Sequence, residues 1–379
     1  MNGGDIRLQA PTLHRWRAGG DPSRDIAVLM SGGVDSSVTA MLLRDAGWNV
    51  LGITMKIPLA ENCDVKRSCC GLEAGYVARD LGIAHYYLDV REAFERLVID
   101  PFRRAYAAGR TPSPCVDCNT LFKFGLVWDF IEESFGVTHL ATGHYARVAH
   151  EDGGAYLVRG DDHSRDQSYF LYGIPRRRLD RFHLPLGELS KDEVRRLARQ
   201  AKLPVARRQD SMELCFVAEG DYRAALGAAP SKGPVLDAAG NVIGEHDGIA
   251  NYTVGQRKGV RVAAGRPLYV VAISAVDNSI TLGPRDLIET REVSAEDANV
   301  LIPDLMRPRS WGGISNPAPT SGLFGKIRSQ GEPMSCEITD AGEGTFSVRF
   351  GEPQFAPTPG QRLVLYDCQG RVVAGGVIR

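Results

Sequence analysis

The chain has 379 residues, of which 43% are hydrophobic and 24% are charged, as in an ordinary folded protein. The formal net charge is −1, so overall charge neither predicts nor excludes a nucleic-acid partner. The N-terminal segment lacks the apolar core of a signal peptide, and no apolar run approaches the length of a membrane span. With eight cysteines in such a chain, we expect reduced thiols, a cytoplasmic location and no membrane contact.

The first half of the chain alternates between apolar runs and helical spacing. Strands are predicted at Ile26 to Met30, Val50 to Met55, Ala84 to Val90 and Val137 to Thr142. Helices are predicted from near Ser36 to Gly47, in a stretch that ends near Gly82, around Phe94 to Phe102, and from Leu121 to Phe135. Pro101 is expected to interrupt or kink the third of these helices. This alternation predicts an α/β fold with a doubly wound parallel sheet. Ligands of such sheets bind at the carboxyl ends of the strands, where the segments after Met30, Met55 and Thr142 should emerge.

The second half changes from helical to β texture. Ser190 and Glu193 predict a capping box for a helix that ends at about Lys202. From about Asp221 short strands alternate with Gly and Pro, and the pattern after about Arg291 predicts a small β-barrel or sandwich. The predicted domains are a loose extension (1–22), an α/β domain (23–218), a small central domain (219–290) and a C-terminal β-barrel domain (291–379). In the segment 176–210 basic residues outnumber acidic ones, which makes it the best local candidate for contacting phosphates.

The turn after the first predicted strand has the sequence SGGVDSS, from Ser31 to Ser37. Its two glycines let the backbone turn sharply and bring N–H groups close to a ligand, and small hydroxyls and a helix N-terminus complete a site suited to phosphate. The chain has no GKS or GKT at this point, so the turn is not the usual nucleotide P-loop. It resembles the pyrophosphate loop of enzymes that split ATP into AMP and pyrophosphate.

The second informative stretch is RTPSPCVDCN, which contains Cys115 and Cys118. Its two prolines are expected to preclude a regular helix and to hold an exposed, rigid loop. The cysteine pair can be a redox dithiol, two metal ligands or a chance arrangement, and its spacing does not decide among these. Cys215, in QDSMELCFV, is by itself more typical of a buried small hydrophobic residue than of a nucleophile.

Taken together, the motifs resemble those of the tRNA-specific 2-thiouridylases, the MnmA family. They are SGGVDSS, RTPSPCVDCN, ATGHYAR, DQSYFLY, LPLGEL, DSMELCF, GEHDGIANYTVGQRKG and the closing TPGQ with Gly375-Gly376, in the order of the family and over about residues 24–379. The resemblance implies sulfur transfer to the wobble uridine (position 34) of the tRNAs for Lys, Glu and Gln. ATP would adenylate the uridine O2, and Mg²⁺ would offset the triphosphate charge.

The resemblance also implies roles for individual residues. Cys215 matches the cysteine that carries sulfur as a persulfide, and Cys118 matches the second catalytic cysteine, which can form a disulfide with Cys215. The ATP contacts implied are Leu29, Met30, Ser31, Gly32, Gly33, Val34, Asp35, Ser36, Met55 and Gly143. A thiolate or persulfide is a strong nucleophile at neutral pH, and adenylation makes the uracil C2 open to attack, so these roles are chemically consistent.

The implied partner is the anticodon stem-loop of tRNA, from which the uridine must flip into the site. The tRNA contacts implied are Ser113, Pro114, Cys115, His144, Arg165, Asp166, Gln167, Arg328, Ser329 and Gln361, of which Arg328 matches only loosely. The C-terminal β domain is expected to grip the anticodon stem. A cysteine desulfurase or a sulfur-relay protein is the expected sulfur donor, and a monomer is the expected state.

Cys115 departs from the family pattern, because many members have Asp at this position. That Asp is a candidate acid or base, and Cys115 cannot simply inherit its role. Cys115, Cys118 and Cys215 instead resemble the three ligands of a [4Fe–4S] cluster with an open iron, as in other tRNA thiolation enzymes with this ATP loop. Two routes, through a cluster or through a persulfide and a disulfide, therefore stay open.

Other functions remain open at this stage. An ATP-dependent ligase or amidotransferase of the same loop family would not need Cys118 and Cys215. A non-catalytic tRNA-binding module would leave the SGGVDSS loop unexplained, and thiolation at another tRNA position is a further alternative. The remaining cysteines, Cys63, Cys69, Cys70, Cys336 and Cys368, are expected to be structural.

Overall fold

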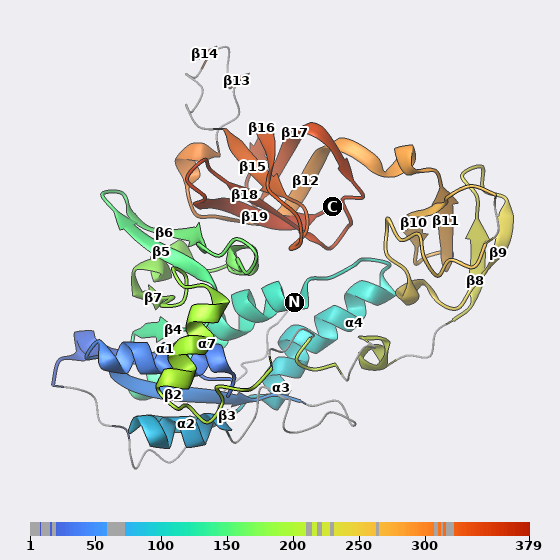
Figure 1. The fold of residues 1–379 in the computed structure, drawn as a ribbon. Coiled ribbons are helices and arrows are strands. Elements are labelled where there is room, and N and C mark those ends of the chain that lie inside the picture. Colours follow the sequence, from blue (N-terminus) through green and yellow to red (C-terminus); the bar gives the residue numbers. More distant parts are fainter. Residues whose placement is uncertain are drawn as a thin grey trace. The chain divides into compact units, whose positions relative to one another are not determined.

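The computed structural model describes residues 8, 16, 20–58, 73–209, 214–217, 222–227, 231–262, 265–306, 310–311, 314–315 and 322–379. Cys63, Cys69 and Cys70 lie outside this set. The chain divides into two compact units, the first formed by Met1–Val98 with Cys115–Tyr222 and the second by Ile99–Pro114 with Arg223–Arg379. Figure 1 gives the positions of the elements along the chain.

The first unit is built on a parallel sheet. Its strands are β1 (Asp25–Leu29), β2 (Asn49–Lys56), β3 (Ala84–Asp89), β4 (His139–Ala141) and β7 (Phe182–His183). They lie in the order β3-β2-β1-β4-β7, and every neighbouring pair is parallel. The central β1 is buried along its whole length, as its apolar run requires. The predicted doubly wound parallel sheet is confirmed.

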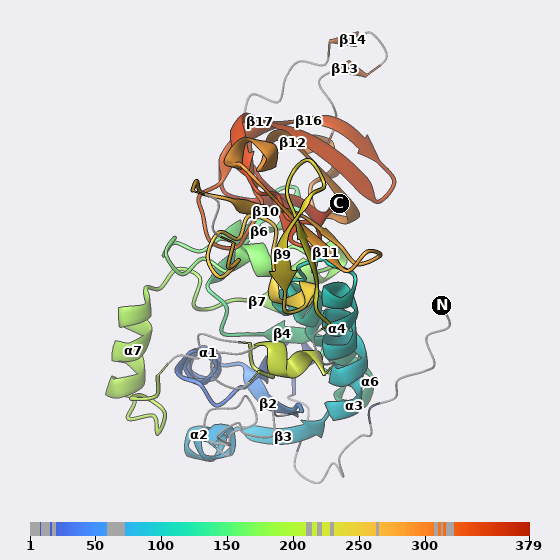
Figure 2. The same ribbon diagram turned by 90° about the vertical axis from the view of Figure 1, so that its right-hand side faces the viewer.

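Helices cover both faces of this sheet, as Figure 2 shows, with α1, α2 and α7 on one side and α3 and α6 on the other. The helical elements are α1 (Val34–Asp45), α2 (Glu73–Leu81), α3 (Arg91–Phe94), the π-helical η2 (Glu95–Ile99), α5 (Pro114–Asp117), the π-helical η3 (Cys118–Val127), α6 (Trp128–Phe135) and α7 (Lys191–Gln200). The capping box of Ser190 and Glu193 opens α7 as predicted. The helix α1 begins at Val34, earlier than the predicted Ser36.

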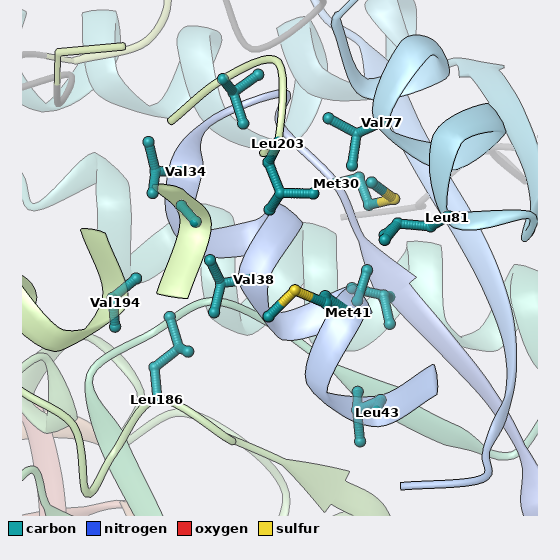
Figure 3. Packing of buried hydrophobic residues seen from close by; sticks show 14 of the residues in the cluster. Met30, Val34, Val38, Met41, Leu43, Val77, Leu81, Leu186, Val194 and Leu203 are labelled. Atoms are coloured by element: carbon teal, nitrogen blue, oxygen red, sulfur yellow. The ribbon is translucent and has the colours of Figure 1, made fainter. Parts of the chain in front are cut away.

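A continuous apolar core joins α1 to the sheet and to its neighbouring helices. Val34, Val38 and Met41 follow one another at helical spacing on α1 and are buried. Figure 3 shows these side chains next to Val77 of α2 and Val194 of α7. This core fixes the start of α1 against the end of β1, which is where the SGGVDSS turn lies.

Smaller elements complete the first unit. A hairpin of β5 (Ala146–Glu151) and β6 (Gly154–Arg159) follows β4. The short helices are η1 (Pro22–Arg24), η4 (Ser168–Phe170), η5 (Arg176–Arg181) and η6 (Tyr222–Leu226). Only Tyr222 of η6 belongs to the first unit, and the rest of η6 belongs to the second. Along the chain, the helical stretch after β3 changes at Pro101, because the π-helical η2 ends and α4 (Asp100–Ala107) begins there. This change of helix type is the predicted interruption.

The second unit contains a small sheet and a closed β-barrel. The small sheet has β8 (Gly233–Leu236), β9 (Val242–His246), β10 (Tyr269–Ser274) and β11 (Ser279–Gly283), in the order β10-β11-β8-β9. The barrel runs β12-β17-β16-β15-β18-β19, with β12 (Glu289–Val300), β15 (Leu323–Lys326), β16 (Met334–Gly342), β17 (Thr345–Phe355), β18 (Arg362–Tyr366) and β19 (Val372–Ile378). The short elements are η7 (Ile249–Asn251), η8 (Arg285–Ile288), η9 (Pro303–Leu305), β13 (Ser310–Trp311) and β14 (Ile314–Ser315). The six strands close on one another, so of the two predicted architectures the C-terminal part forms the barrel and not the sandwich.

Asn278 lies in the turn between β10 and β11 with a φ of 47°, a left-handed conformation that asparagine tolerates. The two strands form an antiparallel hairpin across this turn. Among the residues that the structure describes, no helix combines the length and the apolar character needed to cross a membrane.

Two half-buried histidines of the parallel sheet make folding stability depend on pH. Burial lowers the pKa of His85 and of His183 to about 4. Each unfolded imidazole has a pKa of about 6.5, so the unfolded chain binds more protons than the folded chain between pH 6.5 and pH 4. We expect the free energy of unfolding to decrease as the pH is lowered from 6.5 to 4, by on the order of 2 kcal/mol for each histidine.

Denaturant unfolding at several pH values measures this effect. His85 accepts or donates a hydrogen bond with Thr54 Oγ1 at 2.8 Å, so His85→Gln keeps a polar side chain at this position without a group that titrates near neutral pH. The variant should show a shallower decrease between pH 6.5 and pH 4 than the parent. Identical pH profiles for the two proteins would show that His85 does not contribute to the pH dependence of stability.

Candidate active site

The SGGVDSS turn is held closed by its own hydroxyl groups. The backbone N–H of Ser31 donates to Ser36 Oγ at 3.2 Å, and Ser37 Oγ donates to the Gly33 carbonyl at 2.8 Å. Gly32 has a φ of +74°, which favours glycine because it carries no Cβ. The turn leads directly into α1, so backbone N–H groups at the helix start are available to an anion.

Gly143 lies directly against this turn, as expected for segments that emerge at one edge of a parallel sheet. A Cβ atom on Gly143 would lie 2.8 Å from Ser36 N and 2.9 Å from the carbonyl carbon of Asp35. Such distances are too short for any side chain. The absence of a side chain at Gly143 therefore lets the segment after β4 approach the start of α1. Gly143 thus lies directly against Asp35 and Ser36, which are also ATP candidates.

The carboxylate of Asp35 is the polar centre of the site. Lys191 Nζ, at the first residue of α7, lies 2.7 and 2.8 Å from its two oxygens, and the Tyr145 hydroxyl donates to Oδ1 at 2.9 Å. The Lys191 side chain is only 10% exposed. Sequence reasoning missed both partners, although Lys191 follows the capping serine of α7 and therefore has a fixed place in the fold.

A second cation, Arg208, lies on the same turn. Arg208 Nη1 donates to the Gly32 carbonyl at 2.9 Å and is 3.4 Å from Glu73 Oε2. Arg208 and Lys191 both belong to the basic segment 176–210, which the sequence marks as the best local candidate for contacting phosphates. In the structure these two cations lie on the SGGVDSS turn, Lys191 through Asp35 and Arg208 through the Gly32 carbonyl.

Other charges of the same segment hold the fold. Arg178 is buried, donates to the Phe124 carbonyl and to Asp129, and lies over the Trp128 ring at 4.8 Å. Arg181 Nη1 is 3.2 Å from Glu132 Oε1. A buried cation that is satisfied by protein groups cannot also contact a nucleic acid, so the expectation is wrong for Arg178. The exposed basic side chains that remain are Arg176, Arg177, Arg196, Arg199, Lys202 and Arg207.

The remaining ATP candidates contribute in different ways. Leu29, Met30 and Val34 are 6%, 2% and 4% exposed, and Met30 and Val34 belong to the apolar core. Any contact that they make with a nucleotide therefore involves the backbone. Met55 is half-buried near the end of β2, where it pairs with Leu88 of β3. Ser31 is exposed, so its hydroxyl is accessible to a ligand.

The two cysteines of RTPSPCVDCN lie on a helix and not in a loop. α5 spans Pro114–Asp117, Asp117 has φ −61° and ψ −42°, and η3 continues directly from Cys118. The expected rigid loop is therefore wrong from Pro114 onward. Proline is compatible with the first position of a helix, where its missing N–H would have no partner anyway. Cys115 is exposed and Cys118 is buried.

The segment of Cys215 is connected to the segment of Cys118 through one aromatic ring. Phe122, on the turn of η3 after Cys118, packs against Phe94 with ring centroids 5.2 Å apart. Phe216, next to Cys215, packs against the same Phe94 at 5.9 Å. The two cysteine-bearing segments thus share a packing partner within the first unit. Cys215 itself is half-buried.

The positions of Cys115, Cys118 and Cys215 can be compared with those of the ligands in a three-cysteine metal site. Among the described residues, no group of three or more His, Cys, Asp or Glu side chains is arranged to hold a metal ion. Cys115, Cys118 and Cys215 all belong to the described residues. In this structure the three thiols do not form such a ligand group, and the cluster stays a prediction.

His144 lies beside the ATP candidates and is neutral. Its Nδ1 is 2.7 Å from Thr142 Oγ1, and its ring packs edge-on to Phe124. Burial, with a contribution from the Lys123 charge, lowers the pKa of His144 to about 3. At neutral pH the side chain can therefore donate or accept a hydrogen bond but carries no charge for a phosphate.

The Arg165-Asp166-Gln167 segment divides into one exposed and two supporting residues. Arg165 is exposed. The Asp166 carboxylate is 1% exposed and accepts hydrogen bonds from the backbone N–H groups of Gly160 and Ser168. Gln167 Oε1 accepts from the Tyr145 backbone N–H at 2.9 Å. The side chains of Asp166 and Gln167 hold the loop through these bonds within the protein, and their tRNA contacts stay predictions.

In the second unit, two further RNA candidates contact one another. Ser113 Oγ donates to Gln361 Oε1 at 3.5 Å, and Gln361 Nε2 donates to the Thr111 carbonyl at 3.3 Å. The Thr111 backbone N–H donates to the Pro359 carbonyl at 2.9 Å. The barrel segment before β18 therefore holds the residues that lead to Pro114. Arg328, exposed, donates to the Phe355 carbonyl, and Ser329 follows it.

Gly360 makes this junction possible and provides a test. Its φ is +94°, and a Cβ there would lie 2.8 Å from the Thr111 carbonyl oxygen. We expect Gly360→Ala to lower the unfolding free energy by about 1–3 kcal/mol, because of backbone strain and the close contact. Gly351→Ala, whose Cβ would meet nothing closer than 3.7 Å, is the matched control. Thermal unfolding of both variants measures the difference, and equal stabilities would contradict the role of Gly360.

The parallel sheet, the glycine-rich turn between β1 and α1, and the close approach of Gly143 define an ATP-using domain of the pyrophosphate-loop class. Protein-family comparison agrees with this architecture. Residues 24–219 match the tRNA methyl transferase HUP domain, residues 226–284 the tRNA methyl transferase PRC-barrel domain, and residues 306–378 the aminomethyltransferase beta-barrel domain.

Full-length relatives specify the family. The chain is 41% identical over 360 residues to tRNA-specific 2-thiouridylase MnmA 1 of Syntrophus aciditrophicus, covering 93% of this chain and 92% of the relative. It is also 41% identical over 363 residues to the tRNA-specific 2-thiouridylase MnmA of Pelotomaculum thermopropionicum, covering 93% and 96%. The chain belongs to the MnmA family of tRNA-specific 2-thiouridylases, which are tRNA sulfurtransferases. The resemblance and the enzyme class predicted from the motifs are confirmed.

Solved structures show only distant similarity. The U34-tRNA thiolase NcsA from Methanococcus maripaludis, solved with its [4Fe-4S] cluster, matches with a TM-score of 0.31 and 18% identity over 48% of this chain and 57% of that chain. A similarity of this size supports no conclusion about the chemistry of the present chain.

Proposed function

We propose that this protein catalyses ATP-dependent 2-thiolation of the wobble uridine (position 34) in the tRNAs for Lys, Glu and Gln. The products are 2-thiouridine, AMP and pyrophosphate. The observation that carries the proposal is the 41% identity to 2-thiouridylases over 93% of the chain. The contact between Gly143 and the start of α1 supports it, because it gathers the implied ATP residues at one edge of the sheet.

The first step is adenylation of the base. The uridine O2 attacks the α-phosphate of ATP, the bond to the β-phosphate breaks, and pyrophosphate leaves. Backbone N–H groups of the SGGVDSS turn bind the pyrophosphate oxygens, and Lys191 and Arg208 supply positive charge next to that turn. Mg²⁺ bound with the nucleotide would offset further triphosphate charge.

The second step transfers sulfur. The terminal sulfur of a Cys215 persulfide attacks C2 of the adenylated uridine, and AMP leaves with the oxygen. The Cys118 thiolate then attacks Cys215 Sγ, the sulfur–sulfur bond of the persulfide breaks, and its electron pair stays on the new 2-thiouridine. Packing of both cysteine-bearing segments against Phe94 supports this pairing of roles. It leaves a disulfide between Cys118 and Cys215.

The substrate is proposed to bind through the anticodon stem-loop, with the target base flipped out of the stack. The exposed Arg165 and Arg328 are suited to phosphate contacts, and Ser113 and Gln361, which bond to one another in the second unit, are suited to polar contacts. The sulfur donor is proposed to be a cysteine desulfurase or a sulfur-relay protein in the cytoplasm. The small sheet and the barrel would serve as tRNA-binding domains.

Methylation of tRNA is a second candidate activity, because two of the matching family models are described as methyl transferase domains. Mass spectrometry of tRNA nucleosides, after reaction with ATP and a persulfide, distinguishes the two. We expect 2-thiouridine, formed together with pyrophosphate. A methylated nucleoside, or pyrophosphate release without any change in the tRNA, would overturn the proposal; the second result would favour a ligase or amidotransferase.

A further inference from the structure

The chain carries a cysteine, Cys115, that the proposed reaction does not use. Residues 115–118 are helical, so Cys115 and Cys118 lie one turn apart on the same face of a helix. Helix geometry puts their Cα atoms about 5 Å apart, within the range that disulfides span. The two thiols differ in access, because Cys115 is exposed and Cys118 is buried.

The difference in access matters after each turnover. The proposed reaction ends with a disulfide between the buried Cys118 and the half-buried Cys215. Before another persulfide can form on Cys215, this disulfide must be opened. A reductant has poor access to a sulfur atom that is buried, and access controls the rate of thiol–disulfide exchange. An exposed neighbouring thiol one helical turn away removes this obstacle.

We propose that Cys115 is a resolving thiol that moves the disulfide to the protein surface. The proposal rests on the proposed function and deepens it. The Cys115 thiolate attacks Cys118 Sγ of the Cys118–Cys215 disulfide, the bond to Cys215 breaks, and Cys215 leaves as a thiolate that takes up the proton. The exchange needs no oxidant, because one disulfide is converted into another. A dithiol reductant then reduces the exposed Cys115–Cys118 disulfide to two thiols.

The arrangement of the thiols favours this role over metal binding. The described residues contain no metal-ligating group of three or more His, Cys, Asp or Glu side chains, although Cys115, Cys118 and Cys215 are all among them. A disulfide relay needs only one pair of thiols in contact at a time. The aspartate that many family members have at this position cannot perform the exchange, so the relay is a property of chains with cysteine here.

The test compares the parent with Cys115→Ser and, as a matched exposed cysteine on the barrel, Cys368→Ser. Because Cys115 is also an implied tRNA contact, the multiple-turnover rate of each protein is divided by its own single-turnover rate of 2-thiouridine formation from enzyme preloaded with persulfide. With a protein dithiol such as thioredoxin as reductant, the multiple-turnover rate of Cys115→Ser should fall by about tenfold or more. A small phosphine reductant should restore it, because a small molecule reaches the buried disulfide.

Disulfide mapping after one turnover gives an independent readout. After alkylation and peptide mass spectrometry, the parent should contain a Cys115–Cys118 disulfide and an alkylated Cys215, whereas Cys115→Ser should retain Cys118–Cys215. Full multiple turnover of Cys115→Ser with the protein dithiol would overturn the relay. So would iron and sulfide bound to the anaerobically purified parent and lost in Cys115→Ser. A parent that forms no 2-thiouridine in a single turnover would instead reject the proposed function.

Discussion

Cys215→Ser should form no 2-thiouridine while still releasing pyrophosphate from ATP in the presence of tRNA. A serine hydroxyl cannot carry the transferable sulfur, so we expect thiolation to fall by about a thousandfold or more, as when other enzymes lose their nucleophile. Adenylation involves the SGGVDSS turn and not the thiols, so pyrophosphate release should persist. Nucleoside mass spectrometry and a pyrophosphate assay on the same reaction measure the two steps separately.

Cys118→Ser and Cys368→Ser extend this comparison. Cys118→Ser should still let the Cys215 persulfide attack the adenylated base but fail to release the sulfur, so we expect tRNA joined to Cys215 through a disulfide and no free 2-thiouridine. Cys368→Ser changes an exposed thiol on the barrel and should behave as the parent. If Cys215→Ser thiolated tRNA at the parental rate, sulfur would not pass through this residue, and a ligase-type reaction would be favoured.

Gly143→Ala should have the second largest effect, on the adenylation step. A Cβ at this position would lie 2.8 Å from Ser36 N and 2.9 Å from the Asp35 carbonyl carbon, and both neighbours are backbone atoms that cannot rotate away. The start of α1 must shift relative to the segment after β4. A displacement of about 1 Å can cost about a hundredfold in rate, so we expect a decrease of this size in tRNA-dependent pyrophosphate release.

The control for Gly143→Ala is Gly20→Ala, where an added Cβ meets nothing within 4 Å. Gly20→Ala should match the parent in both pyrophosphate release and thermal unfolding. Gly143→Ala should remain folded, since the core of the first unit lies on the buried faces of α1 and the sheet. Parental activity in Gly143→Ala would show that the two segments do not form one nucleotide site.

The sheet and the turn could be predicted because their signals are local. The apolar run at Ile26 to Met30 has the length of a strand, and it is followed at once by glycines and then by helical spacing at Val34, Val38 and Met41. The rule that ligands bind at the carboxyl ends of parallel strands then connects Gly143 to the turn. The positions of the ATP candidates follow from these elements.

The charge partners could not be predicted, because they depend on tertiary contacts. Lys191 lies far from Asp35 in sequence, and a run of basic residues indicates no partner. The same run places Arg178 in the core and Arg208 on the turn, and only the packing of the helices separates these roles. Likewise, Gln361 reaches Thr111 across most of the chain.

The structure of the cysteine segment differs from the predicted loop for a local reason. Two prolines predict a break in helical structure, yet Pro114 stands at the first helical position, where proline is well tolerated. This position places Cys115 and Cys118 on successive turns of a helix, which the interpretation as a loop had concealed.

The fate of the uridine oxygen tests the central claim most directly. A tRNA substrate with ¹⁸O at the uridine O2 is incubated with ATP and enzyme carrying a persulfide, and the AMP is examined by mass spectrometry. If the SGGVDSS turn supports adenylation of the base, the AMP should carry ¹⁸O in amounts equal to the 2-thiouridine formed. Unlabelled AMP alongside 2-thiouridine would contradict the account, because sulfur would then have entered without an adenylated uridine.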